Sequence, residues 1–319
     1  MSLGTRLTSL SFYDVVDFPR QLWETACWPK LRYLRGIRLP GECAAALARS
    51  LPSLEVLDAF PEGQWAGAGE AVFGRVRQAR LQECCDSFAA HARISSLLPS
   101  LERLTLWEDR GIFSTDVAGA TRLTHLELGH DTLWVSHEVQ PRALAALCTL
   151  PRLRHLALNV KPCHVPQLAR LPAALEVLRL YVARSLDDSG EVAWRPEELE
   201  GKPDLCRVLE AVARLPRLRS PHINGPGMEL HHGPLAAQLG GRLGALEDLE
   251  VCCFNLQLHD VAVLATLPAG LPLLCAWDVS GSPEVFAKLV KQHARRGLEI
   301  EEDCGCDTTF YFSFEDDWP

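Results

Sequence analysis

Cysteine and histidine are the residue types in this chain that could bind a transition metal. A structural zinc site usually combines a compact Cys-x-x-Cys pair with a second pair at a defined spacing. The chain instead offers Cys304-Gly305-Cys306, and more distant candidate ligands are Cys252, Cys253, His231, His232 and His259. Because Cys-x-Cys lacks the usual spacing, we expect no bound metal. A metal-binding or cysteine-dependent enzyme is therefore the least favoured function.

Motifs for phosphate binding and hydrolysis are also incomplete. The glycines at 67, 69 and 74 have the wrong spacing for a dinucleotide-binding turn, and Gly201-Lys202 is followed by Pro203 where a phosphate loop has Ser or Thr. His137-Glu138 lacks the second histidine of His-Glu-x-x-His. We therefore expect no cofactor and no enzymatic activity.

The composition indicates a folded, soluble chain. It has 319 residues, of which 47% are hydrophobic, and a net charge of −9 that argues against nucleic acid as the main partner. No run approaches the roughly 20 apolar residues of a membrane-spanning helix. The 12 cysteines are scattered rather than arranged as a disulfide framework. We expect buried, reduced thiols and a cytoplasmic protein with no membrane partner.

A short apolar phrase recurs along the whole chain and must position any functional residue. It reads apolar-x-x-apolar-x-apolar, as in Leu101-x-x-Leu104-x-Leu106, and we number its first residue position 1. Positions 4 and 6 share one face of a strand. Most steps between copies lie in or next to the 20–29 residues of a leucine-rich repeat. The first anchors are Leu7, Leu31, Leu54, Val76, Leu101, Leu123, Leu153, Leu175, Leu218, Leu246 and Leu274.

Helical patterns lie between these predicted strands, at residues 42–51, 141–150, 204–215, 260–267 and 283–296. Several end in Leu-Pro, as at Leu51-Pro52 and Leu150-Pro151. Proline disfavours helix at the residue before it, so each helix should stop there and the next strand begin. The predicted unit is strand, turn, helix, turn.

The chain thus resembles an intracellular leucine-rich repeat protein, with repeats similar to those of ribonuclease-inhibitor-like and F-box-associated proteins. The resemblance implies an α/β solenoid of about 11 repeats in a horseshoe, with parallel strands on the concave face and short helices on the convex face. The family usually has Asn or Cys at position 9, whereas this chain has Asp109 and Asp131 at two such sites and unrelated residues elsewhere. We therefore expect irregular turns.

The domain prediction is a solenoid over residues 1–296 and a β-type cap with an acidic tail over residues 297–319. Residues 183–203 form an insertion or a degenerate repeat around Trp194. This tryptophan could contact a partner from a loop or fold back to fill a gap. The cap would hide the open end of the last repeat.

Positions 3, 5 and 7 should point away from the core and line the concave face. Three features mark it: large aromatic rings, arginines early and carboxylates late in the chain, and two histidines at the same position of successive strands. Each has a plain alternative: the rings could pack on one another, the charge order could be accidental, and the histidines could simply be hydrogen-bonded. The expected partner-binding residues are Tyr33, Arg35, Phe60, Arg80, Arg103, Trp107, His125, Glu127, His155, Asn159, Arg179, Tyr181, His222, Asp248 and Glu250.

A face of this kind predicts binding of a protein, because Trp, Tyr and Arg dominate interface energetics. We expect a non-enzymatic protein–protein interaction module or scaffold. The alternative, by resemblance to F-box-associated repeats, is a substrate-recognition subunit of a ubiquitin-ligase complex whose adaptor domain is absent here. The same face could also bind a second copy of the chain.

Overall fold

The strands of the computed structural model follow the apolar repeat. The structure describes residues 6–17, 27–65, 71–82, 93–107, 117–129, 141–182, 205–228, 246–247, 249–257, 274–280 and 300–301. Two units make up the chain: unit 1 contains residues 1–130 and 145–153, and unit 2 contains residues 131–144 and 154–319.

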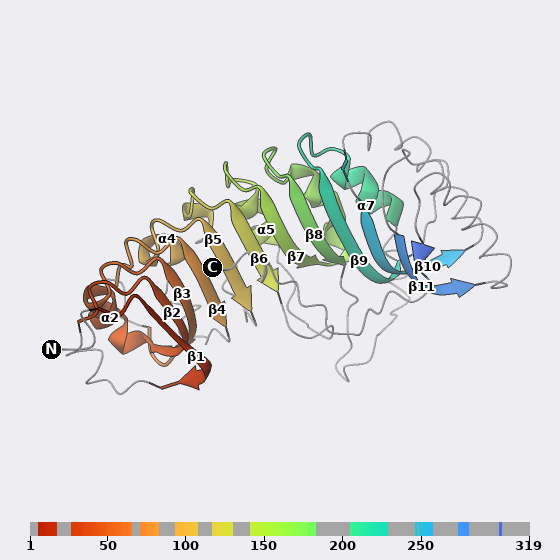
Figure 1. The fold of residues 1–319 in the computed structure, drawn as a ribbon. Coiled ribbons are helices and arrows are strands. Elements are labelled where there is room, and N and C mark those ends of the chain that lie inside the picture. Colours follow the sequence, from red (N-terminus) through yellow and green to blue (C-terminus); the bar gives the residue numbers. More distant parts are fainter. Residues whose placement is uncertain are drawn as a thin grey trace. The chain divides into compact units, whose positions relative to one another are not determined.

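Unit 1 contains six parallel strands that lie side by side in chain order, drawn from red to yellow in Figure 1. They are β1 (Ser9–Val16), β2 (Tyr33–Pro40), β3 (Val56–Glu62), β4 (Gln78–Gln82), β5 (Arg103–Trp107) and β6 (His125–Gly129). Each repeat contributes one strand, so residues at the same position of neighbouring repeats lie beside each other in the sheet. Arg103 on β5, for example, pairs with His125 on β6.

Unit 2 continues the same pattern. Its strands are β7 (His155–Val160), β8 (Val177–Val182), β9 (Ser220–Met228), β10 (Glu250–Gln257), β11 (Leu274–Ser280) and β12 (Ile300–Glu301). All pairs from β7 to β12 are parallel and again follow chain order. Parallel strands require a crossover, which the turns and helices between them supply.

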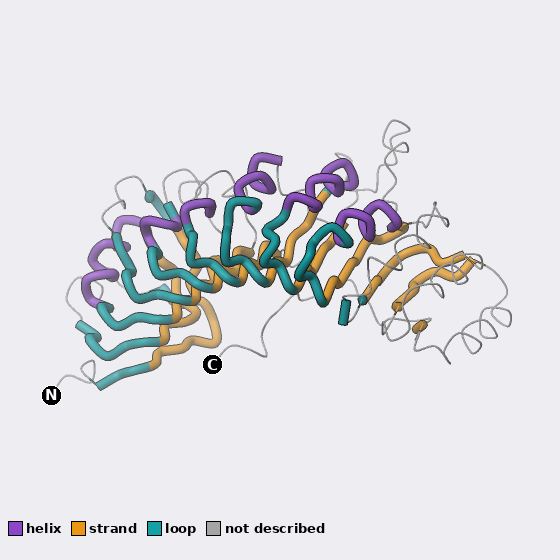
Figure 2. Tube along the Cα trace, turned by 90° about the horizontal axis from the view of Figure 1, so that it is seen from above, coloured by secondary structure: helices purple, strands orange, loops and turns teal. Residues whose placement is uncertain are grey.

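Short helices provide these crossovers, and Figure 2 shows them on one side of the strands in each unit. They are η2 (Gly41–Cys43), α2 (Ala44–Ser50), α4 (Ile94–Leu97), η5 (Val117–Gly119), α5 (Pro141–Leu147), η6 (Pro162–Arg170) and α7 (Leu205–Val212). Helices therefore occur in the predicted ranges 42–51, 141–150 and 204–215. The predicted helices at 260–267 and 283–296 lie outside the described residues.

The core is built from positions 1, 4 and 6 of the repeat. Leu153, Leu156 and Leu158 are buried in this way, and the same holds for the anchors of each repeat from Leu31 to Leu175. Burial of a leucine side chain contributes about 1.5–3 kcal/mol, so a ladder of such residues is the main stabilising contribution. Stacked repeats bury one continuous apolar layer that no single repeat could bury alone.

The Leu-Pro step forms a tight turn as well as ending the helix. The amide of Leu54 donates to the carbonyl of Leu51, and the amide of Leu175 donates to the carbonyl of Pro172. In the first case proline is the second residue of a four-residue turn, a position that its fixed φ favours. The turn delivers the anchor at position 1 directly into the next strand.

One bulge changes the predicted register on β2. Leu34 pairs with Leu57, but the next pair joins Ile37 to Ala59, so one extra residue is accommodated between them. Gly36 allows this with a φ of 72°. Ile37, which the regular repeat places at outward position 7, is instead fully buried. Arg38 takes the outward place and pairs with Phe60.

Two further expectations are wrong. Leu274 was expected at position 1, but it pairs with Val251, which occupies position 6 of the preceding repeat. The expectation of buried thiols fails for Cys27 and Cys163, which are exposed, although Cys43 is buried and all three are reduced.

Several predictions lie outside the described residues. These are the insertion at 183–203 with Trp194, the position-9 residues Asp109 and Asp131, and all of the predicted cap except Ile300 and Glu301. Ile300 pairs with Leu274 on β11, in parallel.

Candidate functional site

A row of polar side chains crosses the outward face of unit 1 at position 5. It consists of Arg35, Asp58, Arg80, Thr105 and Glu127. The register aligns Asp58 with Arg80, Arg80 with Thr105, and Thr105 with Glu127. Neighbouring parallel strands lie about 4.8 Å apart, so each charge is close to the next in the row. The row alternates in sign from Arg35 to Arg80.

Asp58 is the carboxylate between the two arginines. Burial raises its pKa above the ordinary value, whereas Arg80, a hydrogen bond from Gln82 and the charge of Arg35 act in the opposite direction. Gln82 donates from Nε2 to Asp58 Oδ1 over 3.0 Å. The carboxylate is thus held in a fixed position by side chains of its own face.

Glu127 is the most deeply buried member of the row, with 2% of its surface exposed. Thr105, at 6% exposed, donates from Oγ1 to Glu127 Oε2 over 3.2 Å. Glu127, predicted as a partner-binding residue, is therefore buried, as is its neighbour Thr105 on β5. Arg35 and Arg80 are half-buried, so part of each side chain remains accessible on this face.

Position 3 supplies a second row, in which Tyr33 and His125 are half-buried. The guanidinium carbon of Arg32 lies 5.8 Å from the centroid of the Tyr33 ring, within cation–π range. Thr124 donates its one hydroxyl proton to the carbonyl of Glu102 over 3.0 Å. His125 Nδ1 is 2.8 Å from the same hydroxyl oxygen, within hydrogen-bond distance.

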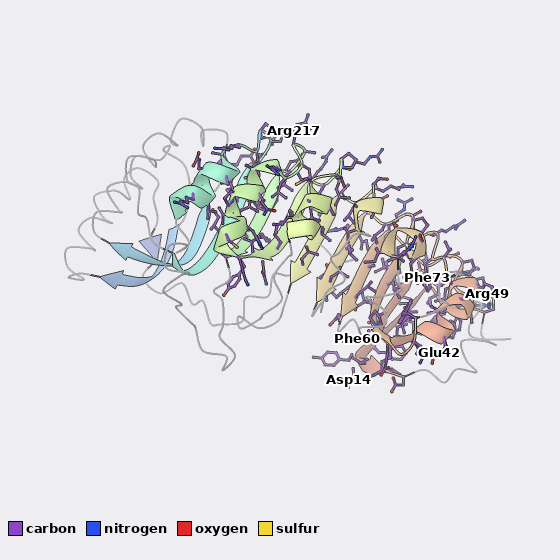
Figure 3. The ribbon with its side chains drawn as sticks, turned by 180° about the vertical axis from the view of Figure 1, so that it is seen from behind. Asp14, Glu42, Arg49, Phe60, Phe73 and Arg217 are labelled. Atoms are coloured by element: carbon purple, nitrogen blue, oxygen red, sulfur yellow. The ribbon has the colours of Figure 1, made fainter. Side chains whose placement is uncertain are left out.

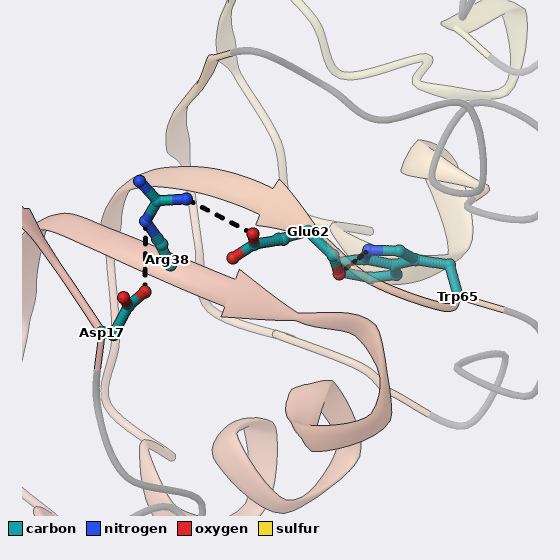
Figure 4. Close-up of polar contacts among 4 residues, drawn as sticks. All are labelled: Asp17, Arg38, Glu62 and Trp65. Carbon is teal, nitrogen blue, oxygen red and sulfur yellow. Dashed lines mark hydrogen bonds and ion pairs between the residues drawn. The ribbon is translucent and has the colours of Figure 1, made fainter.

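The ends of β1 to β3 carry an ion-pair bridge that the sequence pattern missed. Figure 4 shows Arg38 between two carboxylates, 3.1 Å from Asp17 and 3.3 Å from Glu62. Trp65 donates from its indole nitrogen to the Glu62 carbonyl over 3.1 Å. Phe60, half-buried on the neighbouring strand, is labelled on the ribbon in Figure 3. The bulge at Gly36 is what brings Arg38 to this place.

The predicted site residues of unit 2 whose side chains are described, His155, Asn159, Arg179, Tyr181 and His222, include one arginine and no carboxylate. The register aligns His155 with Val177, Arg179 with His222, and Asn159 with Tyr181. Tyr181 was expected to project outward, but only 6% of it is exposed. Its ring contributes to packing and offers a partner little area.

Other predicted site residues are outside what the structure describes. The side chains of Trp107, Asp248 and Glu250 belong to this group, although the backbone of Glu250 pairs with His222. His125 and His155 lie in different units, so their proximity stays a prediction. The expected order of arginines early and carboxylates late in the chain also stays a prediction, because it spans both units.

A second alternation, at position 2, also escaped the sequence analysis. Arginines and glutamates follow each other from repeat to repeat, and three ion pairs result: Arg32–Glu55 at 2.6 Å, Arg154–Glu176 at 3.6 Å and Arg219–Glu247 at 2.9 Å. The signal was visible in the sequence, because each residue directly follows a position-1 anchor. It appears only when residues one repeat apart are compared.

Metal and membrane sites are not found in the described part of the chain. No three His, Cys, Asp or Glu side chains there are grouped to hold a metal ion. None of its helices is long and apolar enough to cross a membrane. The candidate ligands His231, His232, His259, Cys304 and Cys306 are not among the described residues.

Comparison with known proteins finds likeness in structure alone. Neither a family model nor a curated protein matches the chain. An internalin from Listeria monocytogenes is similar, with 16% identity and a TM-score of 0.44, over 93% of this chain and 87% of the internalin chain. The TLR13–ssRNA13 complex is similar with 18% identity and a TM-score of 0.46, over 90% of this chain and 38% of the TLR13 chain. At these scores, neither ligand nor partner carries over.

The strand register supplies the architectural assignment. Leucines one repeat apart pair across the sheet, as Leu104 does with Leu126 in unit 1 and Leu156 with Leu178 in unit 2. The chain has the leucine-rich repeat architecture.

Proposed function

We propose that this chain is a non-enzymatic protein-interaction module whose partner binds the outward face of unit 1. One observation carries the proposal. The Arg35–Asp58–Arg80 row is ordered by its own contacts and flanked by two half-buried aromatic rings, Tyr33 and Phe60. Core packing requires none of these side chains, because positions 1, 4 and 6 supply the buried apolar layer. Aromatic rings beside arginines are typical of the residues that dominate binding energy in interfaces.

The mechanism would be recognition without covalent chemistry. Preordered charges lose little conformational entropy on binding, and charges of both signs orient a partner with the complementary pattern. The half-buried rings would supply apolar area between these charges. A protein surface offers both groups, whereas a small ligand would need a concave pocket.

The experiment is affinity capture with wild type beside Tyr33→Ala/Phe60→Ala. The matched control is Val72→Ala, an exposed apolar residue that lies outside the repeat positions of this face. Circular dichroism first establishes that all three proteins are equally folded. A partner retained by wild type and control but lost by the double variant supports the proposal. A partner retained equally by all three contradicts it.

The affinity-capture experiment also tests more specific functions of the chain. Ligase subunits among the retained proteins would support a substrate receptor of a ubiquitin-ligase complex. Concentration-dependent size in sedimentation, abolished by the double variant, would identify a second copy of the chain as the occupant. A cytoplasmic location belongs to the same proposal and is tested by fractionation.

A further inference from the structure

The edge at which the strands of unit 1 begin carries a charge pattern unlike that of the whole chain. The chain has a net charge of −9. Along this edge from β2 to β6, five exposed cations accompany two carboxylates, Glu55 and Glu102, and a further exposed cation, Arg6, precedes β1. The five cations from β2 to β6, which we call the basic edge, are Lys30, Arg32, Arg75, Arg77 and Arg122.

The cations come from every second repeat. Lys30 and Arg32 precede β2, Arg75 and Arg77 precede β4, and Arg122 precedes β6. The glutamates precede the strands in between, β3 and β5. Since neighbouring strands are about 4.8 Å apart, the basic rows repeat every ~9.6 Å along the edge.

Ion pairing neutralises only part of this charge. Arg32 pairs with Glu55 over 2.6 Å, and Arg122 pairs with Glu102 over 3.5 Å. Among the described residues, no ion pair forms with Lys30, Arg75 or Arg77. Arg77 and Arg75 do lower the pKa of Glu55, after the larger effect of its hydrogen bond from Arg32. Their positive field therefore extends over the middle of the edge.

Unit 2 shows a weaker form of the same pattern. Arg154 and Arg219 each follow an anchor two strands apart, but both are paired, with Glu176 and Glu247. Arg217 has no ion pair with any residue that the structure describes, and Figure 3 shows it projecting from the ribbon. Within the part of the chain that the structure describes, three basic rows on alternate strands occur at the edge of unit 1.

We propose that the basic edge of unit 1 binds an extended acidic peptide segment of a partner protein, with a carboxylate at every third residue. A polyproline II segment has three residues per turn and rises ~3.1 Å per residue. Every third side chain then lies on one face, ~9.3 Å from the next, which matches the spacing of the basic rows. In a β-strand, residues i and i+3 point to opposite sides, so that conformation does not fit.

The glutamates between the rows discriminate against other polyanions. A nucleic acid carries a charge at every nucleotide, so phosphates would also stand opposite Glu55 and Glu102. A peptide with neutral residues between its carboxylates avoids that repulsion. The alternating edge thus selects both charge and spacing.

The test uses two labelled, capped peptides of equal charge: three Glu-Pro-Pro units, and three Glu-Pro-Pro-Pro units. In the second, the carboxylates leave the common face and lie ~12.4 Å apart along the helix. Fluorescence anisotropy at low salt should give about tenfold weaker binding for the second peptide. Equal affinity for the two peptides would overturn the proposal without any variant being needed.

Variants locate the site. Arg75→Gln/Arg77→Gln should weaken binding of the Glu-Pro-Pro peptide about tenfold, because it removes the middle row. The control Arg170→Gln/Arg214→Gln removes the same charge from exposed positions of unit 2 outside the repeat rows and should stay within about twofold. An equal loss in both variants would assign binding to net charge and overturn the proposal. Tighter binding of a single-stranded oligonucleotide or of anionic vesicles at the same edge would also overturn it.

The edge and the outward face can be separated. Phe60→Ala alone should bind the Glu-Pro-Pro peptide normally, since it leaves all five cations and the Tyr33 ring that Arg32 contacts in place. If no partner binds the outward face, the result with the Glu-Pro-Pro peptide does not change. If no peptide binds the basic edge, the result of the affinity capture does not change.

Discussion

Units 1 and 2 share an inward pattern and differ in the outward one. Both bury leucines at positions 1, 4 and 6. At position 5, unit 1 has Arg35, Asp58 and Arg80 before its buried Thr105–Glu127 pair, whereas unit 2 begins with a buried alanine, Ala157, followed by Arg179 and His222. At position 7, unit 1 presents the half-buried Phe60, while unit 2 buries Tyr181.

This difference shows that the fold constrains the inward positions of the repeat more strictly than the outward positions. Inward positions must fill space at close packing, which restricts them to a few apolar residues. Outward positions meet water or one another, so the same backbone tolerates charge in one unit and packed rings in the other. Both of our functional proposals fall on unit 1 for this reason: its outward face and its strand-start edge carry ordered charges beyond those the fold requires.

Replacing a tyrosine in each unit should give the largest contrast. Tyr181→Ala removes a buried ring and should lower the free energy of unfolding by about 3 kcal/mol. Tyr33→Ala removes a half-buried ring and should cost about 1 kcal/mol. Urea denaturation monitored by circular dichroism measures both. Equal losses would show that Tyr181 is no more a packing residue than Tyr33 and would break the comparison.

The bulge in unit 1 has no counterpart between β7 and β8, whose six aligned pairs run without a shift. Gly36→Ala should cost about 2 kcal/mol, because a left-handed backbone disfavours a Cβ. That Cβ would also lie 2.5 Å from the Phe12 carbonyl oxygen. Gly74→Ala, where a Cβ meets nothing within 4 Å, should stay within about 0.5 kcal/mol. Thermal denaturation of the pair tests this, and an unchanged melting temperature for Gly36→Ala would contradict the bulge.

Loss of a side-chain hydroxyl should cost more at Thr105 in unit 1 than at Ser220 in unit 2. Thr105→Val leaves the buried Glu127 without this donor and should cost about 1–2 kcal/mol. Ser220→Ala in unit 2 affects a half-buried hydroxyl 3.3 Å from His222 Nε2. It should cost about 0.5 kcal/mol. Chemical denaturation at neutral pH measures the free energy of unfolding of both variants. A larger decrease for Ser220→Ala than for Thr105→Val would contradict this prediction.

The smallest effect should be a pH dependence from Asp58. Because its pKa is raised in the folded chain, folding favours the protonated form. That stabilisation is complete below the unfolded value, near 3.8, and is lost as the pH rises through the folded pKa. Asp58→Asn stays neutral, so its stability relative to wild type should increase across this window. Denaturation curves at several pH values measure the difference; a decrease toward neutral pH would mean that Arg35 and Arg80 outweigh burial.

The repeat itself could be predicted from sequence because it depends on local periodicity. The parallel strands after Leu101 and Leu153, and helices in the ranges 42–51 and 204–215, follow from apolar spacing and Leu-Pro steps. The outward row Asp58, Arg80, Thr105 and Glu127 was also assigned to the correct positions. Burial along that row was not predictable, because it depends on how neighbouring side chains cover each other.

Register irregularity was the second source of error. Gly36 stands at position 6, where the repeat expects an apolar residue, and a glycine inside a strand often marks a bulge. Which strand carries the extra residue, however, appears only when two strands are compared. The consequence was a wrong assignment for Ile37 and a missed ion-pair site at Arg38. The displaced Leu274 is a further example, since its apolar neighbours allow more than one alignment.

The sequence by itself determined the repeat, its inward leucines and the order of parallel strands, because these follow from periodicity and from the need to bury apolar residues. It also contained the alternating charges of the basic edge, although only the paired strands show that they form rows. Tertiary structure alone decided which outward residues are exposed, where Arg38 lies and which charges neutralise one another. Those properties depend on contacts between residues more than 20 positions apart, such as Arg32 with Glu55 and Thr105 with Glu127, and local spacing does not encode how such side chains meet.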